Sequence, residues 1–121
     1  MGGKSRRKGK RGELEAAAEI RRLFRTEARR GRQFQGTDES PDVLADIEDV
    51  HVEVKRTEAL RLYEALAQAI EDAGTKVPLV LHRANRKPWV AIVRLDDLPR
   101  LAVQLYLTLA AKGVNHKEIW T

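Results

Sequence analysis

The stretch Ser40–Arg56, S-P-D-V-L-A-D-I-E-D-V-H-V-E-V-K-R, organises the rest of this chain. Valines at 50, 52 and 54 alternate with polar residues, which predicts a strand with two different faces. Because side chains two apart on a strand share a face, Glu53 and Lys55 are expected to point the same way. Residues 43–45 are expected to pair with this strand as a hairpin through a turn at 46–49. That pairing brings Asp42 near Glu53.

Two carboxylates beside an ammonium group, in a basic protein, favour a hard-cation site that acts on a phosphodiester. Mg²⁺ takes oxygen ligands and often needs only one or two carboxylates, because water and substrate phosphate complete its coordination. A lysine at the same place can position the attacking water or stabilise charge on the phosphate. The spacing alone is equally compatible with a solvated hairpin that carries a charged face.

The same residues carry a resemblance to a known family. Pro41-Asp42, ten intervening residues and then Glu53-Val54-Lys55 resemble the PD-(D/E)XK nuclease signature. Upstream, residues 8–15 read K-G-K-R-G-E-L-E, which is similar to the K-G-x-x-x-E-R-E opening of archaeal-type Holliday-junction resolvases and their phage relatives. The resemblance covers roughly the first two thirds of the chain. One departure is Leu14, which stands where the archaeal pattern has an arginine.

The resemblance implies a metal-dependent endonuclease, most simply a Holliday-junction resolvase that cuts four-way DNA junctions in symmetric strand pairs. In this hypothesis Mg²⁺, for which Mn²⁺ is expected to substitute, is held by Asp42, Glu53, the backbone carbonyl of Val54 and Glu13. Lys55 joins Asp42, Glu53 and Glu13 as a catalytic residue. Two alternatives stay open: another nuclease of the same superfamily that acts on flaps, ends or duplexes, and a non-catalytic DNA-binding protein with a degenerate nuclease fold.

Composition favours a polyanionic partner and sets limits on the chemistry. The 121 residues carry a net charge of +5 and no cysteine, which excludes disulfides and thiolate metal sites. The length predicts one domain. No long apolar run or secretory signal is seen, so we expect no membrane partner and a cytoplasmic protein, in a bacterial or phage-infected cell.

Basic residues at several places are candidates for DNA contact. Residues 1–12 hold six Lys and Arg and no acid, and are expected to form a flexible basic tail ahead of a single nuclease domain at 13–121. Solvated charge is the alternative explanation for the tail and for a cluster near residue 85. The predicted DNA-binding residues are Lys8, Lys10, Arg11, Arg32, Arg83, Arg86 and Lys87.

The remaining periodicities predict an α/β domain with a mixed central β-sheet flanked by helices, which matches the restriction-endonuclease-like core implied by the resemblance. The expected elements are a helix at 13–30, an edge strand at 33–35, a helix at 57–73 capped by Thr57, strands at 77–83 and 89–95, and a helix that follows Asp97. Apolar residues of this last helix, among them Val103, Tyr106 and Leu107, extend beyond one stripe. We therefore expect a two-fold homodimer. The alternative is that these residues close a small core.

Overall fold

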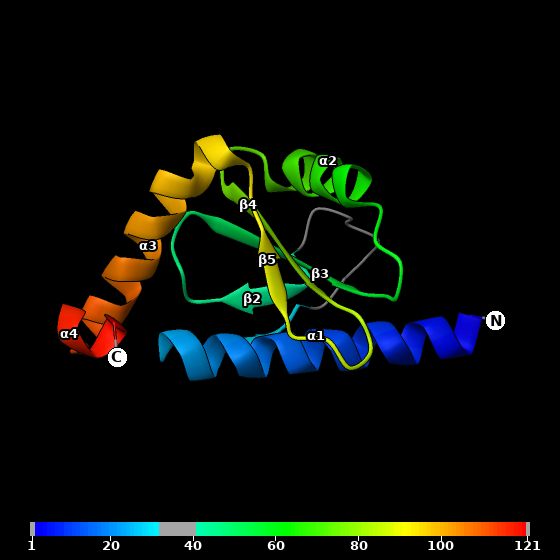
Figure 1. The fold of residues 1–121 in the computed structure, drawn as a ribbon, viewed down its shortest axis with the longest axis horizontal. Helices are drawn as coiled ribbons and strands as arrows, with labels where there is room; N and C mark the ends of the chain where they lie inside the picture. Colours follow the sequence, from blue (N-terminus) through cyan, green and yellow to red (C-terminus); the bar gives the residue numbers. More distant parts are fainter. Residues whose placement is uncertain (1, 32–40, 121) are drawn as a thin grey trace.

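A mixed five-stranded sheet lies between helices at the centre of the molecule (Figure 1). The computed structural model describes residues 2–31 and 41–120, with the backbone alone at 2–8, 116 and 120. The third and fourth strands pair in parallel, and the other neighbouring pairs are antiparallel. The predicted α/β class with a mixed sheet is therefore confirmed. In spatial order the strands are β1 (Ala28–Arg30), β2 (Val43–Ala45), β3 (Val50–Arg56), β4 (Val77–Arg83) and β5 (Val90–Ile92).

Helices cover both faces of the sheet. α1 (Gly2–Phe24) packs on one face, and α2 (Leu62–Ala73) packs on the other and supplies the crossover that the parallel pair β3–β4 requires (Figure 1). A 3-10 turn, η1 (Leu95–Asp97), leads into α3 (Leu98–Ala111), which is followed by α4 (His116–Trp120). Within the part of the chain that the structure describes, no helix is both long and apolar enough to cross a membrane.

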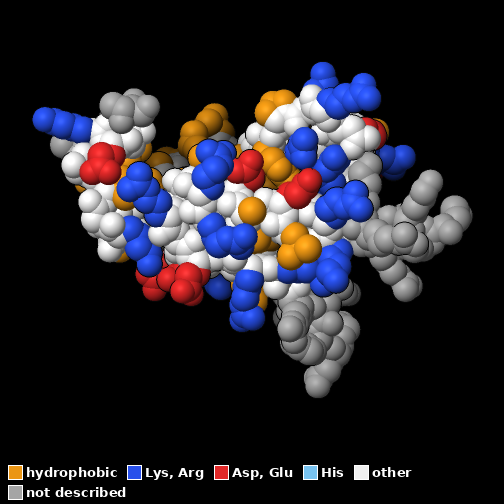
Figure 2. Space-filling view, turned by 90° about the horizontal axis from the view of Figure 1, so that it is seen from below, with side chains coloured by type: hydrophobic (Ala, Val, Ile, Leu, Met, Phe, Trp, Pro, Cys, Tyr) orange, Lys and Arg blue, Asp and Glu red, His pale blue; other side chains and the backbone are white. Residues whose placement is uncertain are grey.

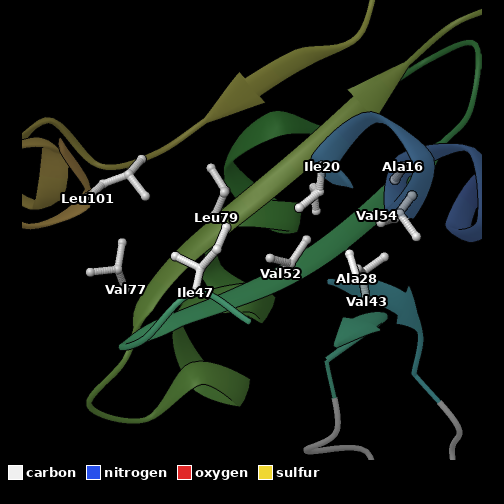
Figure 3. Close-up of a cluster of buried hydrophobic side chains, with 11 residues drawn as sticks. Ala16, Ile20, Ala28, Val43, Ile47, Val52, Val54, Val77, Leu79 and Leu101 are labelled. Carbon is white, nitrogen blue, oxygen red and sulfur yellow. The ribbon is translucent and has the colours of Figure 1, made fainter. Parts of the chain in front are cut away.

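The two faces of β3 have different neighbours, which fixes where polar groups can lie. Val52 and Val54 pack with Ala16 and Ile20 of α1 in the main buried cluster (Figure 3). The alternate residues of the strand therefore face the side that α2 covers. There α2 buries small residues, at 65, 69 and 73, which allow the helix to approach the sheet closely.

The first helix differs from the prediction at both ends. It begins at Gly2, so residues 2–12, expected as a flexible tail, are helical here, because Lys and Arg are good helix formers that extend a helix stabilised by packing. It ends at Phe24 instead of residue 30, since Arg25 takes a positive φ of 50° and the chain then enters β1. The strand predicted at 33–35 lies outside the described residues.

The second helix starts later than predicted, and the elements after it are closer to their predicted bounds. Thr57 does not cap α2, because its hydroxyl donates to the carbonyl of Ala59 in the preceding loop. β4 has the predicted bounds, and β5 is shorter than predicted. α3 follows Asp97 directly, as predicted, but the Asp97 carboxylate accepts a hydrogen bond from Arg94 and makes no capping hydrogen bond.

Candidate active site

The β2–β3 hairpin brings Asp42 to the middle of β3. Val43 pairs with Val52, and the Asp42 N–H donates to the Val52 carbonyl at 3.0 Å. The Asp42 side chain is also fixed, since its Oδ2 accepts a hydrogen bond from the Val54 N–H at 2.8 Å. The side chains of Asp42 and Glu53 are then within hydrogen-bonding reach of each other, in agreement with the expectation that the hairpin brings Asp42 near Glu53.

Glu53 is buried and has a second partner that the sequence analysis did not place in the site. Its Oε1 lies 2.7 Å from Nε2 of His51, and the two residues are only 8% and 4% exposed. The strand alternation puts His51 on the face shared by Glu53 and Lys55. The alternation of the strand could therefore have placed His51 beside Glu53. It did not identify His51 as a site residue, because a histidine on a strand can also be buried for structural reasons alone.

The Asp42 carboxyl is held mainly in its neutral form. Its pKa is raised to about 8, first because the group is buried and then because of its hydrogen bond with Glu53. The Val54 N–H lowers the pKa, and the negative charges of Glu53 and Glu13 raise it further. Two carboxyl groups this close need a shared proton or a cation between them.

Glu13 does not complete a group of three ligands with Asp42 and Glu53. In the described parts of the chain, no three His, Asp or Glu side chains are gathered closely enough to hold a metal ion. Glu13 instead accepts a hydrogen bond from Nε of Arg30 at 2.5 Å, because β1 places this arginine against α1. The negative charge of Glu13 is the smallest of the causes that raise the pKa of Asp42.

The remaining groups fit a cation that is bound by few protein ligands. Asp42 and Glu53 supply the one or two carboxylates that Mg²⁺ usually takes from a protein. The carbonyl of Val54 points to the same side of β3 as its N–H, which donates to Asp42, because the two groups of a strand residue face the same neighbour. Val54 could therefore add an oxygen ligand, as the resemblance implies.

Lys55 lies one step further along β3, on the face that carries Glu53. It is partly buried and lines a groove between the end of the strand and α2, together with Thr57, Arg61 and Gln68. An ammonium group in such a groove is able to donate hydrogen bonds to water or to a phosphate oxygen. Glu53 and Lys55 thus lie on one face of β3, with Asp42 against Glu53, and Glu13 contributes negative charge from α1.

This chain matches no family model, no curated protein and no solved structure.

The predicted DNA-binding residues are distributed over two regions. Lys10 and Arg11 are exposed on α1, and Figure 2 shows Lys and Arg side chains spread along the α1 face with acidic groups among them. Arg86 and Lys87 are exposed in the β4–β5 loop. Lys8 belongs to α1, but its side chain is outside the described part, and Arg32 lies outside the described residues altogether.

Arg83 is engaged within the protein. Its Nε donates to the Lys87 carbonyl at 2.8 Å, and its Nη1 lies 3.4 Å from Glu15 Oε1. Glu15 also lies 3.6 Å from Nε of Arg56. Arg83 therefore connects the β4–β5 loop to α1, and its contact with DNA stays a prediction.

The raised pKa of Asp42 predicts how the stability of the metal-free protein depends on pH. The folded state keeps a proton that the unfolded chain releases above its ordinary pKa of 3.8, so the contribution of Asp42 to stability is full below about pH 4 and is lost as pH rises toward 8. We expect a loss of roughly 4 kcal/mol between pH 5 and pH 8, at about 1.4 kcal/mol per pH unit. Urea unfolding with a chelator present measures it.

Asp42→Asn is the control for this dependence, because the amide cannot ionise and can still accept the hydrogen bond from Val54. The stability of the variant is expected to fall much less between pH 5 and pH 8, so that the variant is more stable than the wild type at pH 8. An identical loss of stability with rising pH in both proteins would show that groups other than Asp42 cause it.

Proposed function

We propose that this protein is a divalent-cation-dependent nuclease that hydrolyses phosphodiester bonds in DNA. The observation that carries the proposal is the contact between the partly buried Asp42 and the buried Glu53, in a chain with a net charge of +5. A protein that only binds a polyanion gains nothing from acids held together at the cost of a raised pKa. The position of α1 before the hairpin and of α2 after it supports a restriction-endonuclease-like core.

Each residue has a distinct role in this mechanism. Asp42 and Glu53 hold the cation, with the Val54 carbonyl as a further oxygen donor and Glu13 adding negative charge from α1. A bound Mg²⁺ supplies Lewis-acid stabilisation of the phosphoryl oxygens and a more acidic water. Lys55 donates hydrogen bonds that orient the attacking water and offset the charge that develops on the phosphate.

We infer branched DNA, and specifically the four-way junction, as the substrate. The basis is the motif resemblance, which includes the opening at residues 8–15. The exposed basic residues Lys10, Arg11, Arg86 and Lys87 are suited to phosphate contacts, which position DNA without reading its sequence.

The test is a comparison of labelled four-way, flap, nicked and linear DNA, each incubated with Mg²⁺, with Mn²⁺ and with a chelator. We expect metal-dependent cleavage of the four-way junction at paired positions in opposite strands. Equal cleavage of flaps or ends would favour another nuclease of the same superfamily. Binding of every DNA without cleavage under any condition would favour the non-catalytic alternative and remove the proposal.

A second copy of the chain is the partner that we propose for α3. Its Leu98, Val103, Tyr106 and Leu107 are between 46% and 54% exposed. Between Leu98 and Ala111 the only charged residue is Arg100, which is bonded to Asp49 at the β2–β3 turn. Two copies that each carry a charge of +5 repel one another, so their contact is favoured on a surface without charge. A two-fold contact there would present two sites to one junction.

The double substitution Val103→Glu with Leu107→Glu is expected to convert the dimer to a monomer, because it places four carboxylates at the contact. Size-exclusion chromatography with light scattering measures the mass. Leu23→Glu is the matched control, since Leu23 is 51% exposed on α1 and lines a groove beside the β4–β5 loop instead of the exposed face of α3. A monomeric wild type, or a dimer that survives the double substitution, would contradict this surface.

A further inference from the structure

We infer that His51 is a positioning residue that fixes the carboxylate of Glu53 for cation binding; this inference rests on the proposed function. His51 stands two residues before Glu53 on β3, and its ring is within hydrogen-bond distance of that carboxylate, at 2.7 Å from Nε2 to Oε1. A carboxylate oxygen accepts, so Nε2–H is the donor. Nothing in the PD-(D/E)XK motif itself refers to this position.

Burial makes the contact strong and directional. The side chains of His51 and Glu53 are 4% and 10% exposed, so water does not compete effectively for either group. Burying a polar group destabilises the folded protein unless the group is hydrogen bonded, and here His51 and Glu53 are hydrogen-bond partners of each other. α2 packs on this side of the sheet, opposite α1, through its small buried residues at 65, 69 and 73.

Glu53 is thereby held from two sides. His51 holds Oε1, and Asp42, itself fixed by the Val54 N–H, is hydrogen bonded to the same carboxyl group. Rotation of Glu53 would break the His51 bond, so the carboxylate is already oriented before any cation arrives. Partners of this kind orient metal-binding side chains, and their removal typically weakens metal binding about 10- to 100-fold.

A second histidine on the sheet, His82, has no carboxylate partner among the described residues and serves as a comparison for His51. His82 lies on the adjacent strand β4, opposite Lys55, and its Nε2 lies 2.8 Å from the carbonyl of Thr57. The two histidines therefore have similar bond lengths but different partners, a carboxylate and a backbone carbonyl. His82 is the internal control for loss of an imidazole from the sheet.

The experiment compares His51→Gln, His51→Asn and His82→Asn by the affinity of each protein for Mn²⁺, measured by electron paramagnetic resonance without DNA. The amide nitrogen of glutamine can reach the position of Nε2, whereas that of asparagine is one methylene shorter. We expect affinity at least about 10-fold weaker in His51→Asn. His51→Gln should retain affinity within about threefold, and His82→Asn should bind as the wild type does.

Equal affinity in His51→Asn and the wild type would overturn the inference, and so would equal weakening in the asparagine and glutamine variants. Circular dichroism confirms that the compared variants are folded. If an asparagine variant does not fold, His51→Gln and His51→Leu are compared in the same way.

Failure of the proposed function is distinguishable from failure of this inference. A wild type that binds no Mn²⁺ removes the cation site, and the role of His51 is then decided on the metal-free protein. The ¹⁵N resonance of His51 Nε2 should shift in Glu53→Gln, and that of His82 should not. An unchanged His51 resonance would show that Nε2 does not hold this carboxylate.

Discussion

Asp42→Asn and Glu53→Gln are each expected to abolish DNA cleavage while the protein still binds four-way DNA. Both substitutions remove a negative ligand and preserve the side chain's shape. The amide oxygen in Asp42→Asn can still accept the hydrogen bond from the Val54 N–H, which spans 2.8 Å in the wild type. We expect cleavage to fall on the order of 10³-fold or more, as when groups that stabilise transition-state charge are removed from other enzymes. Single-turnover cleavage and gel-shift assays measure the two properties.

Asp46→Asn is the matched control, because it makes the same chemical change at an exposed acid on the same hairpin. It should cleave at the wild-type rate. Retained cleavage in both Asp42→Asn and Glu53→Gln would refute the assignment of the active site. Loss of DNA binding together with cleavage would instead indicate that these acids organise the DNA-binding surface.

Gly31→Ala is expected to have the largest effect on stability. A Cβ at this position would lie 2.1 Å from the carbonyl oxygen of Pro41 and 3.3 Å from that of Asp42. Both neighbours are backbone atoms, so the strand itself would have to move. The Gly31 N–H also donates to the Asp42 carbonyl at 2.8 Å, so the shift would reach the active site. We expect a loss of about 3 kcal/mol or more in the free energy of unfolding.

Gly9→Ala is the control for this substitution. It lies in α1, and a Cβ there would have no atom within 4 Å. Alanine is the better helix former, so the variant should equal or exceed the wild type in stability, by up to about 1 kcal/mol. Urea unfolding measures both variants. Wild-type stability in Gly31→Ala would show that β1 and the segment before β2 are not packed this closely.

The central hairpin could be predicted from the sequence because its information is local. Alternation at residues 50–56 assigned the two faces of β3, and the short turn before it placed Asp42 near Glu53. Pairing between β1 and β2 was not predictable in this way. Ala28–Arg30 is mostly polar, exposed at two of its three residues, and becomes a strand only through its antiparallel register with β2.

The surroundings of the site depend on long-range contacts that a single sequence does not encode locally. The helical stripe correctly placed Glu13 on α1, but its partner, Arg30, was expected at the end of a helix and lies on β1. Large residues do not mark the face of α2 that packs on the sheet, since Tyr63 is 83% exposed. Alanines pack on the sheet instead, since a small side chain permits close approach.

The β2–β3 hairpin carries both acids of the proposed cation site within twelve residues, and its lysine follows two residues later. These three groups therefore lie in one short, continuous segment of the chain and do not come from segments far apart in the sequence. In the proposed nuclease, loops beyond β4 could therefore change in length or sequence during evolution, and so alter the choice of DNA, without moving these groups.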